Sequence, residues 1–493
     1  MIRAHAVEAV RAAESAAMAR LPEGELMRRA AHGLAEVAAA RLAERDGRTV
    51  VALVGGGDNG GDALYAVAEL ARSGLACVAV LLPADRSGAH ASGLLAAEEA
   101  GASVVVAAKD RDAAAAAVRA ADVVLDGITG IGGRPGLRAD AAALVGAVPD
   151  EAWVIAVDVA SGLDPSGLVR AADTVWADET VTFGTPKPAH LLPAGEAATG
   201  RLTVVDIGID VADVPAAVER LTVGDGARLW PVPGPGDDKY SRGVLGVVAG
   251  GESYPGAAVL AVTAAVEAGA GMVRYVGTPT PTALVRAAVP EAVHGPGRVQ
   301  AWLVGPGLDV TAEGDEAEHQ LAVAAQALDS DLAVVLDAGG LDLLEGTRAA
   351  PTLLTPHAGE LARLLGRLTG REVARADVER DPVGHCRRLA ERTGAVVLLK
   401  GSTTLVVGED PSAPVRSQAD APAWLATAGA GDVLAGLVGT LLAAGLAPRD
   451  AGSLGALVHG VAADLASGGG PLRATAVAGG IPAAVRRLLT RRR

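Results

Sequence analysis

The 493-residue sequence has few aromatic residues, only two cysteines and a shortage of positive charge. Aromatic residues make up 2% of the chain and hydrophobic residues 50%, so a large core must be built from small aliphatic side chains. The formal net charge of −15 argues against a nucleic-acid-binding surface, which needs clustered Lys and Arg. Cys77 and Cys386 are far apart in the sequence, so no disulfide framework is implied and a reducing compartment fits.

Long uncharged hydrophobic runs are also missing. The nearest candidate for a membrane span, 433–447, is too short and too rich in glycine. The first residues carry Arg3, Glu8 and Arg11 and show no apolar segment of a secretory signal. We therefore expect a soluble cytoplasmic protein that binds neither nucleic acid nor a membrane.

Short apolar strands alternate with helical patterns in two series, one over 49–157 and another from 244 onward. Such alternation predicts parallel sheets whose faces are covered by helices. The segment WPVPGPGDD (230–238) interrupts the pattern, and Pro/Gly-rich composition is typical of a linker. We expect α/β domains at 1–215 and 236–493 joined by a linker at 216–235. The two domains are not repeats, because their glycine motifs differ.

The stretch TAGAGDVLAGLVGTLLAAGLA (427–447) changes from small residues to an apolar run with helical spacing. It predicts a glycine turn at 429–431 with Asp432 in the first turn of a helix. Free amides at a helix start attract anions, and a carboxylate there would repel a phosphate unless it acts as a base for a hydroxyl being phosphorylated. The plainer alternative is a capped core helix.

In the first series, polar residues follow the ends of strands: Asp58 and Asn59, then Asp126, then Asp158 and Ser161. In open parallel sheets this carboxyl edge is where ligands bind. Hard oxygen ligands such as those of Asn59, Asp126 and Ser161 suit a monovalent or divalent cation. The alternative is that each acid is a helix cap or turn former.

The loop GGGDNGGD (55–62) also contains G-x-G-x-x-G, with Asp85 as the acid a dinucleotide fold would need. That signal is weak by itself, and the oxygens crowding the loop fit a cation and ribose or amide contacts better. A Gly-rich strand-to-helix turn is the structural alternative.

Three further segments carry candidate residues. Lys187 lies between two prolines, which stiffen the loop and hold the lysine in one place. This suits a lysine that takes part in catalysis or contacts an anion. The alternative is a solvated surface lysine. His357 follows a strand and precedes a helix, so it could contact a ligand or cap the helix. The segment KGSTT (400–404) joins two strands. It could bind a nucleotide through its amides and hydroxyls, or it could be a plain hairpin turn.

Taken in order, the motifs resemble those of the bifunctional NAD(P)H-hydrate repair enzymes over nearly the whole chain. The first half carries the motifs of the epimerase: DNGGD (58–62), LDGITGIG (125–132), DVASGLD (158–164) and VTFGTPKP (181–188). The second half carries those of the ribokinase-like, ADP-dependent dehydratase: GGESYPGAA (250–258), GAGMV (269–273), VGPGL (304–308), LLTPHAGE (353–360), KGSTT (400–404) and ATAGAGDVLAG (426–436). The family loop usually reads NNGGDG, so Asp58 and Ala63 depart from it.

The resemblance implies a Rossmann-like three-layer first domain that interconverts the R and S hydrates of NADH and NADPH. Potassium would be held by Asn59, Asp126 and Ser161, and protons would be handled by Asp158 and Lys187. The implied contacts of the hydrated nucleotide are Asp58, Asn59, Gly60, Gly61, Asp62, Gly130, Ile131, Gly132, Gly133, Arg134, Pro135, Gly136 and Asp158.

For the second, ribokinase-like domain, the resemblance implies dehydration of the S hydrate at the expense of ADP, with a magnesium ion. Asp432 would deprotonate the hydroxyl, ADP would phosphorylate it, and phosphate would then be eliminated, with the glycine turn stabilising the charge on the phosphoryl group. The implied substrate contacts are Ala257, Gly307, His357 and Asp432. The implied contacts of the adenine nucleotide are Lys400, Gly401, Ser402, Thr403, Thr404 and Gly431.

Two other functions remain open from the sequence. A ribokinase-like kinase of a vitamin precursor would explain GAGD but not the first domain. Alternatively, the first domain is a nucleotide-binding or partner-binding module without catalysis. In each case we expect a small-molecule substrate and a homo-oligomer.

Overall fold

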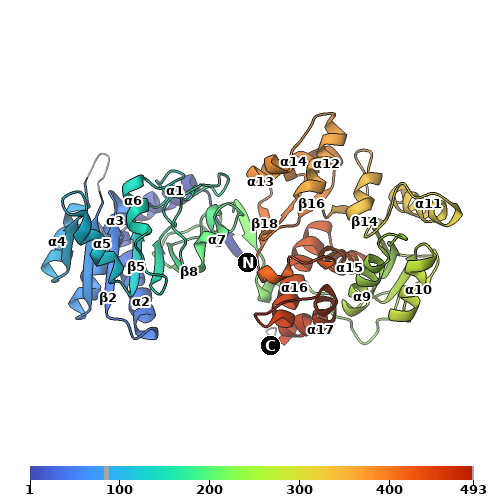
Figure 1. Ribbon diagram of the computed structural model, residues 1–493, viewed down its shortest axis with the longest axis horizontal. Coiled ribbons are helices and arrows are strands. Elements are labelled where there is room, and N and C mark those ends of the chain that lie inside the picture. Colours follow the sequence, from blue (N-terminus) through green and yellow to red (C-terminus); the bar gives the residue numbers. More distant parts are fainter. Residues whose placement is uncertain (83–87, 491–493) are drawn as a thin grey trace. The chain divides into compact units, whose positions relative to one another are not determined.

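The computed structural model describes residues 1–82 and 88–490. They form two compact units: an N-terminal unit, Arg3–Val218, and a C-terminal unit, Met1–Ile2 with Glu219–Arg493. Each unit contains its own sheet, flanked by helices (Figure 1), so the predicted α/β class is confirmed. Asp85 lies outside the described residues.

The N-terminal unit is built on a seven-stranded sheet in the order β4-β3-β2-β5-β6-β7-β8, in which every pairing is parallel. The strands are β2 (Thr49–Val54), β3 (Ala76–Leu81), β4 (Ser103–Val106), β5 (Val123–Gly127), β6 (Trp153–Val157), β7 (Glu179–Phe183) and β8 (Arg201–Val205). The helices are α1 (Val7–Met18), α2 (Glu25–Glu44), α3 (Asp58–Arg72), α4 (Ala91–Glu99), α5 (Arg111–Arg119), α6 (Ala139–Val145), η1 (Pro188–His190) and α7 (Glu196–Thr199).

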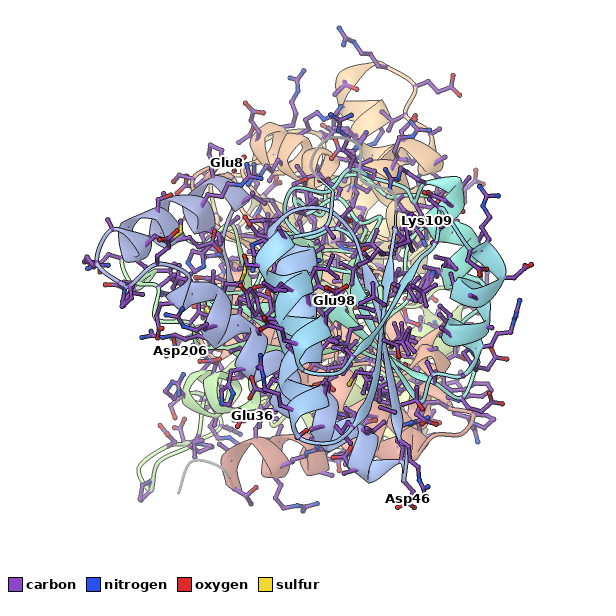
Figure 2. All side chains as sticks on the ribbon, turned by 90° about the vertical axis from the view of Figure 1, so that its left-hand side faces the viewer. Glu8, Glu36, Asp46, Glu98, Lys109 and Asp206 are labelled. Atoms are coloured by element: carbon purple, nitrogen blue, oxygen red, sulfur yellow. The ribbon has the colours of Figure 1, made fainter. Side chains whose placement is uncertain are left out.

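Alternate residues of the central strand β2 face opposite sides of this sheet, as the period of two requires. Val50, Ala52 and Val54 pack with α2, α3 and α4 in one core. Val51 and Leu53 belong to a second core with residues of α5 and α6. The unit therefore has the three predicted layers. Charged side chains such as those of Glu36 and Lys109 project outward from it (Figure 2).

The strand order reverses between β2 and β5, because the chain adds β3 and β4 on one side of β2 and returns to its other side with β5. Such a topological switch point opens a crevice at the carboxyl ends of the two strands. Asn59 follows β2 and Asp126 lies at the end of β5, so the fold brings the two predicted ligands to one place.

The C-terminal unit has an eleven-stranded sheet in the order β1-β9-β18-β17-β16-β15-β14-β13-β10-β11-β12. The pairings from β16 to β12 are parallel, and β17 is antiparallel to both neighbours. The strands are β1 (Ile2–Ala4), β9 (Val218–Arg220), β10 (Val244–Val248), β11 (Met272–Val276), β12 (Val293–His294), β13 (Ala301–Val304), β14 (Ala333–Leu336), β15 (Thr352–Leu354), β16 (Val396–Leu399), β17 (Thr404–Val407) and β18 (Val415–Gln418).

The helices of this unit are α8 (Val223–Leu229), α9 (Pro255–Glu267), α10 (Pro279–Ala288), α11 (Asp315–Asp329), η2 (Ala338–Leu343), α12 (Ala358–Thr369), α13 (Arg375–Arg380), α14 (Pro382–Thr393), η3 (Ala423–Leu425), α15 (Ala430–Ala443), α16 (Pro448–Ser467) and α17 (Ala474–Thr490). Helix α15 packs directly on α9: a Cβ at Gly436 would lie 2.1 Å from the carbonyl oxygen of Ala261. Only glycine allows this approach.

Two segments differ from their sequence interpretation. The run from Asp58 to Asp62 is the first turn of α3 and not a loop, because Gly57 turns the chain with φ of 86° and the helix begins at once. The expected linker 216–235 contains β9 and α8. Helix α8 starts with a capping box between Thr222 and Asp225, which the Pro/Gly composition further along the segment obscured.

None of the helices in the described residues is long and apolar enough to cross a membrane.

We predict that a fragment beginning at Glu219 is more stable than one beginning at Val232. The shorter fragment loses Leu221 and Trp230, which are 2% and 8% exposed in the core of the unit. Burial of a leucine alone is worth about 2 kcal/mol. Thermal unfolding of the two fragments measures the difference, and equal midpoints would show that α8 contributes nothing to this core.

Candidate active sites

A buried carboxylate, Asp126, lies at the crevice of the N-terminal unit. Asp126 is fully buried, and it accepts hydrogen bonds from the Ser161 hydroxyl (2.6 Å), the Ser161 amide (2.7 Å) and the Ile128 amide (3.3 Å). Burial raises the pKa of Asp126 to about 6, against the effect of these bonds. The donors found among the described residues are all neutral, so a cation bound here would compensate the charge.

Asn59 joins this pair through the loop that follows β5. A Cβ at Gly130 would lie 2.6 Å from Asn59 Oδ1, so the predicted ligand and the predicted substrate loop are in contact. Asn59 Nδ2 is buried and has no hydrogen-bond partner. An unpaired buried amide costs free energy, and a ligand in the crevice would satisfy it. The rest of the loop, from Gly132 to Gly136, is largely exposed.

Asp158 and Lys187 form a buried ion pair. Lys187 is 1% exposed, although lysine is rarely buried unless paired, and its ammonium also donates to Thr182 Oγ1 at 2.9 Å and the Phe183 carbonyl at 3.2 Å. Asp158 has a positive φ of 66°, a strained conformation that often accompanies a functional role. The solvated-lysine alternative for Lys187 is therefore wrong.

Further titratable groups surround this pair. Burial and the charge of Asp158 are the largest causes that raise the pKa of Asp62 well above its usual range. Burial also raises the pKa of Glu14 on α1, with Lys187 opposing the shift. Burial next to Lys187 lowers the pKa of His190 to about 3. Glu14 and His190 had no sequence signal, because both depend on where a helix and a loop dock.

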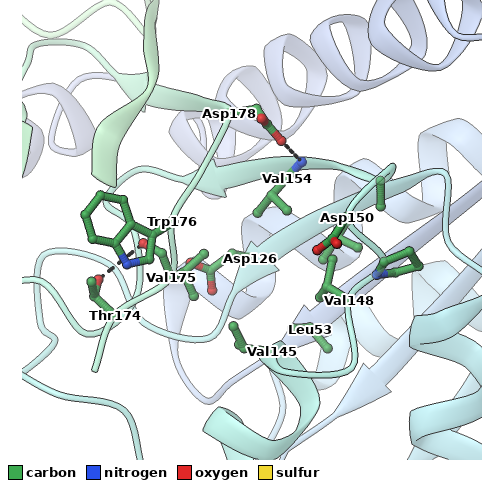
Figure 3. Close-up of a pocket in the computed structure, with 13 residues that line it drawn as sticks. Leu53, Asp126, Val145, Val148, Asp150, Val154, Thr174, Val175, Trp176 and Asp178 are labelled. Atoms are coloured by element: carbon green, nitrogen blue, oxygen red, sulfur yellow. Dashed lines mark hydrogen bonds between the residues drawn. The ribbon is translucent and has the colours of Figure 1, made fainter. Parts of the chain in front are cut away.

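A cavity of about 300 Å³ lies on the α6 side of the sheet (Figure 3). Its walls include Leu53, Val124 and Val145, and Trp176 lies at its exposed rim. Asp126 is the one predicted site residue in its lining. The cavity is thus separate from the Asp158–Lys187 pair.

In the C-terminal unit, Asp432 lies in the first turn of α15, as predicted, and Gly429 caps this helix with φ of 88°. Burial is the largest cause that raises the pKa of Asp432 to about 7; Asp337 and Glu360 raise it further and Lys400 opposes them. The carboxyl is thus poised near neutral pH, which suits a general base. The raised pKa favours the predicted base over the plain capped-helix alternative for Asp432.

Lys400 connects the predicted nucleotide segment to this helix start. Its ammonium lies 2.7 Å from Asp337 Oδ1 and 3.6 Å from Glu360 Oε2. A Cβ at Gly431 would be 3.4 Å from the same ammonium. Lys400, Gly431 and Asp432 are therefore together, at a helix start whose free amides suit a phosphate.

The other predicted residues of this unit have different positions. His357 caps α12, with its Nδ1 accepting from the amides of Gly359 (3.0 Å) and Glu360 (3.2 Å), so the capping interpretation is confirmed. Ala257 and Gly307 meet: a Cβ at Gly307 would lie 2.7 Å from the Ala257 Cβ. The residues Gly401, Ser402 and Thr403 form the turn between β16 and β17, with Thr404 opening β17.

Asp337 and Glu360 were missed as site residues. Asp337 follows β14 directly, so the strand-end rule that selected Asp126 and Asp158 would have found it in the second series. Glu360 lies inside the motif LLTPHAGE. Its carboxylate accepts a hydrogen bond from the His357 amide (2.7 Å) and so caps α12, which is a structural role.

No three His, Cys, Asp or Glu side chains gather as a metal site in the parts of the chain that the structure describes. A set of Asn, Asp and Ser oxygens is compatible with that finding. Mg²⁺ is usually held by one or two carboxylates together with phosphate oxygens. Such a site is also compatible with that finding, because it needs fewer than three carboxylates.

We predict that Asp432→Asn stabilises the protein at pH 8 and has little effect at pH 4. The pKa of about 7 in the folded state lies above the usual value of 3.8 for an aspartate, so the folded chain binds more protons and stability falls as pH rises between these values. Three pKa units correspond to about 4 kcal/mol at most. Calorimetry at both pH values measures this, and an unchanged or lower melting temperature at pH 8 would contradict it.

Two family models match the chain. Residues 23–189 match the YjeF-related protein N-terminus, and residues 245–474 match NAD(P)H-hydrate dehydratase. The Bifunctional NAD(P)H-hydrate repair enzyme Nnr of Mycobacterium tuberculosis is 46% identical over 91% of this chain and 90% of its own length. That of Mycobacterium leprae is 44% identical over 94% of each chain.

Among solved structures, the ADP/ATP-dependent NAD(P)H-hydrate dehydratase of Bacillus subtilis, co-crystallised with ATP/Mg²⁺, matches 56% of this chain and 99% of its own at 24% identity and a TM-score of 0.48. The two curated relatives extend over both halves of the sequence and nearly their full length. The chain therefore belongs to the bifunctional NAD(P)H-hydrate repair enzymes.

Proposed function

We propose that this protein repairs hydrated NADH and NADPH, with an epimerase in the N-terminal unit and an ADP-dependent dehydratase of the S hydrate in the C-terminal unit. The observation that carries the proposal is Asp432, whose pKa is raised to about 7 at the start of α15, where the free amides of a helix suit a phosphate. A kinase of a vitamin precursor would account for the C-terminal unit alone, whereas both halves match the repair enzymes.

In the dehydratase, Ala257, Gly307, His357 and Asp432 would contact the hydrate, and Lys400 to Thr404 with Gly431 would contact ADP. Asp432 removes the proton of the hydroxyl group as that oxygen takes up the phosphoryl group from ADP and AMP is released. Phosphate then leaves with the electrons of the carbon–oxygen bond, and the neighbouring ring carbon loses a proton, which restores the double bond. Lys400 and the amides of α15 stabilise the negative charge that develops. Asp337 and Glu360 would hold a magnesium ion, which would neutralise phosphate charge when bound.

In the epimerase, the open amides at the start of α3 and the exposed loop from Gly130 to Gly136 would hold the dinucleotide. Asp158, fixed by Lys187, would handle protons. Potassium would be held by Asn59, Asp126 and Ser161 and would offset the buried charge of Asp126. A cytoplasmic location and a homo-oligomeric state remain predictions from the sequence.

One assay tests the whole proposal. A mixture of R and S hydrates is supplied with ADP, and recovery of the dihydronicotinamide absorbance is followed. Complete recovery requires both activities, recovery of only the S portion requires the dehydratase alone, and no recovery would refute the assignment.

We predict that Asp432→Asn lowers the dehydration rate by about 10²–10⁴-fold, the usual contribution of a general base, while ADP still binds. Asp331→Asn, which removes an exposed carboxylate of the same unit, is the matched control and should keep the rate. Rates on pure S hydrate and calorimetric titration with ADP measure both effects. A near-normal rate in Asp432→Asn would exclude Asp432 as the base.

We predict that epimerisation requires potassium and falls sharply in Asp126→Asn, which keeps an acceptor for the Ser161 amide but lacks the charge. Dehydration of pure S hydrate should be unaffected in this variant. The measurement compares both activities in potassium and in a bulky organic cation, with Asp150→Asn at the rim of the cavity as control. If neither the exchange of cation nor Asp126→Asn changes the rate of epimerisation, then Asn59, Asp126 and Ser161 are turn formers and not potassium ligands.

A further inference from the structure

Asp62 is a buried acid without a partner in the N-terminal unit. It lies in α3, four residues after Asp58, and is 9% exposed. No hydrogen bond or ion pair to its carboxyl is found within the described residues, whereas Asp158 accepts from Lys187, from Thr182 Oγ1 at 3.0 Å and from the Phe183 amide at 3.3 Å. A buried acid with no partner costs less when protonated.

The charges around Asp62 act in the same direction. Burial raises its pKa, and the negative charges of Asp158, Asp58 and Glu14 raise it further, while Lys187 opposes them. The ammonium of Lys187 is already bound to Asp158. On α4, His90 lies beside Gly61, and on α2, His32 is paired with Glu69 further along α3 at 2.6 Å. Among the described residues Asp62 therefore has no cation of its own, and its pKa is raised well above its usual range, which favours the protonated form.

The carboxyl also has the right neighbours for a role in the reaction. Its charge interactions with Asp158 and Lys187 indicate that the three groups lie near one another. Asn59, three residues earlier on α3, contributes the unpaired Nδ2 there. A carboxylate that is stabilised by an ammonium can act as the base of a reaction. A carboxylic acid whose neutral form is favoured by burial can act as the acid.

We propose that Asp62 is a catalytic residue of the epimerase, where it donates a proton to the hydroxyl group that leaves, opposite the Asp158–Lys187 pair. This role rests on the proposed epimerase activity. It goes beyond nucleotide contact, which is all that the motif at 58–62 implies.

The hydroxyl of the hydrate is on the ring carbon bonded to the ring nitrogen, because water adds to an enamine at that carbon. Asp62 protonates the hydroxyl, the carbon–oxygen bond breaks, and water leaves with the bonding electrons while the nitrogen lone pair forms a C=N⁺ bond. A water molecule then attacks the other face, and its proton passes to the Asp158 carboxylate. Proton exchange with solvent restores Asp62 and Asp158, so atoms and charges balance.

The test compares full-length Asp62→Asn with the unmodified enzyme over a range of pH. We expect kcat for epimerisation to fall by about 10²–10⁴-fold. In the unmodified enzyme the rate should also fall at alkaline pH, where Asp62 loses its proton, and this limb should be absent from Asp62→Asn. Asp62→Glu should restore part of the rate with a displaced limb. Glu8→Gln, which removes an exposed charge from α1 (Figure 2), should change neither quantity.

Thermal unfolding of each variant serves as the folding control, because dehydration by the C-terminal unit does not report on the folding of the N-terminal unit. A rate within threefold of normal in Asp62→Asn, or a slower rate with an unchanged pH profile, would overturn the proposal, since the second outcome is that of a structural residue. If the variants do not fold, ¹³C-carboxyl spectroscopy of Asp432→Asn decides, because this variant lacks the other acid with a pKa raised to about 7 and must still show an Asp that stays protonated at pH 7 and responds to the hydrate. If the unmodified enzyme shows no epimerisation, the proposed function fails and not this assignment alone.

Discussion

Buried carboxyl groups at the carboxyl ends of parallel strands are the constraint on which both candidate sites depend. Asp126 ends β5 and is fully buried, and Asp337 follows β14 at 2% exposure. Desolvation disfavours the charged form of each acid, so each must be compensated or remain protonated. Lys187 and Lys400 compensate two of the acids, Asp158 and Asp337. Among the described residues no ammonium or guanidinium is bound to Asp62 or Asp432, and their pKa values are raised.

In both units the buried acids lie at the carboxyl ends of parallel strands, but the helix starts that contribute to the two sites differ. In the N-terminal unit, Gly57 lets α3 begin immediately after β2, so Asn59 and Asp62 enter the crevice from a helix. In the C-terminal unit, Asp337 follows β14 directly, Glu360 lies in the first turn of α12, and Asp432 lies in the first turn of α15. In both cases a rigid sheet edge and a helix terminus fix the side chains, which limits the reorganisation needed during reaction.

The scarcity of aromatic residues is consistent with this architecture. Small side chains allow close helix contacts, as between Gly436 and Ala261, and α15 is held in place by that packing. The position of Asp432 therefore depends on residues remote from it.

The sequence by itself determined the α/β class, most strand positions, the helix start at Asp432 and the set of strand-end acids, because these depend on local periodicity and on the carboxyl-edge rule. It missed α8, whose capping box lies within a segment of linker composition, and it placed Asp58 to Asp62 in a loop. Only the tertiary structure decided that Lys187 is buried against Asp158, that Glu14 and Asp62 join them, and that Asp337 and Glu360 surround Lys400. These relations connect residues far apart in the chain, and protonation depends on burial and neighbouring charge, which no local pattern encodes.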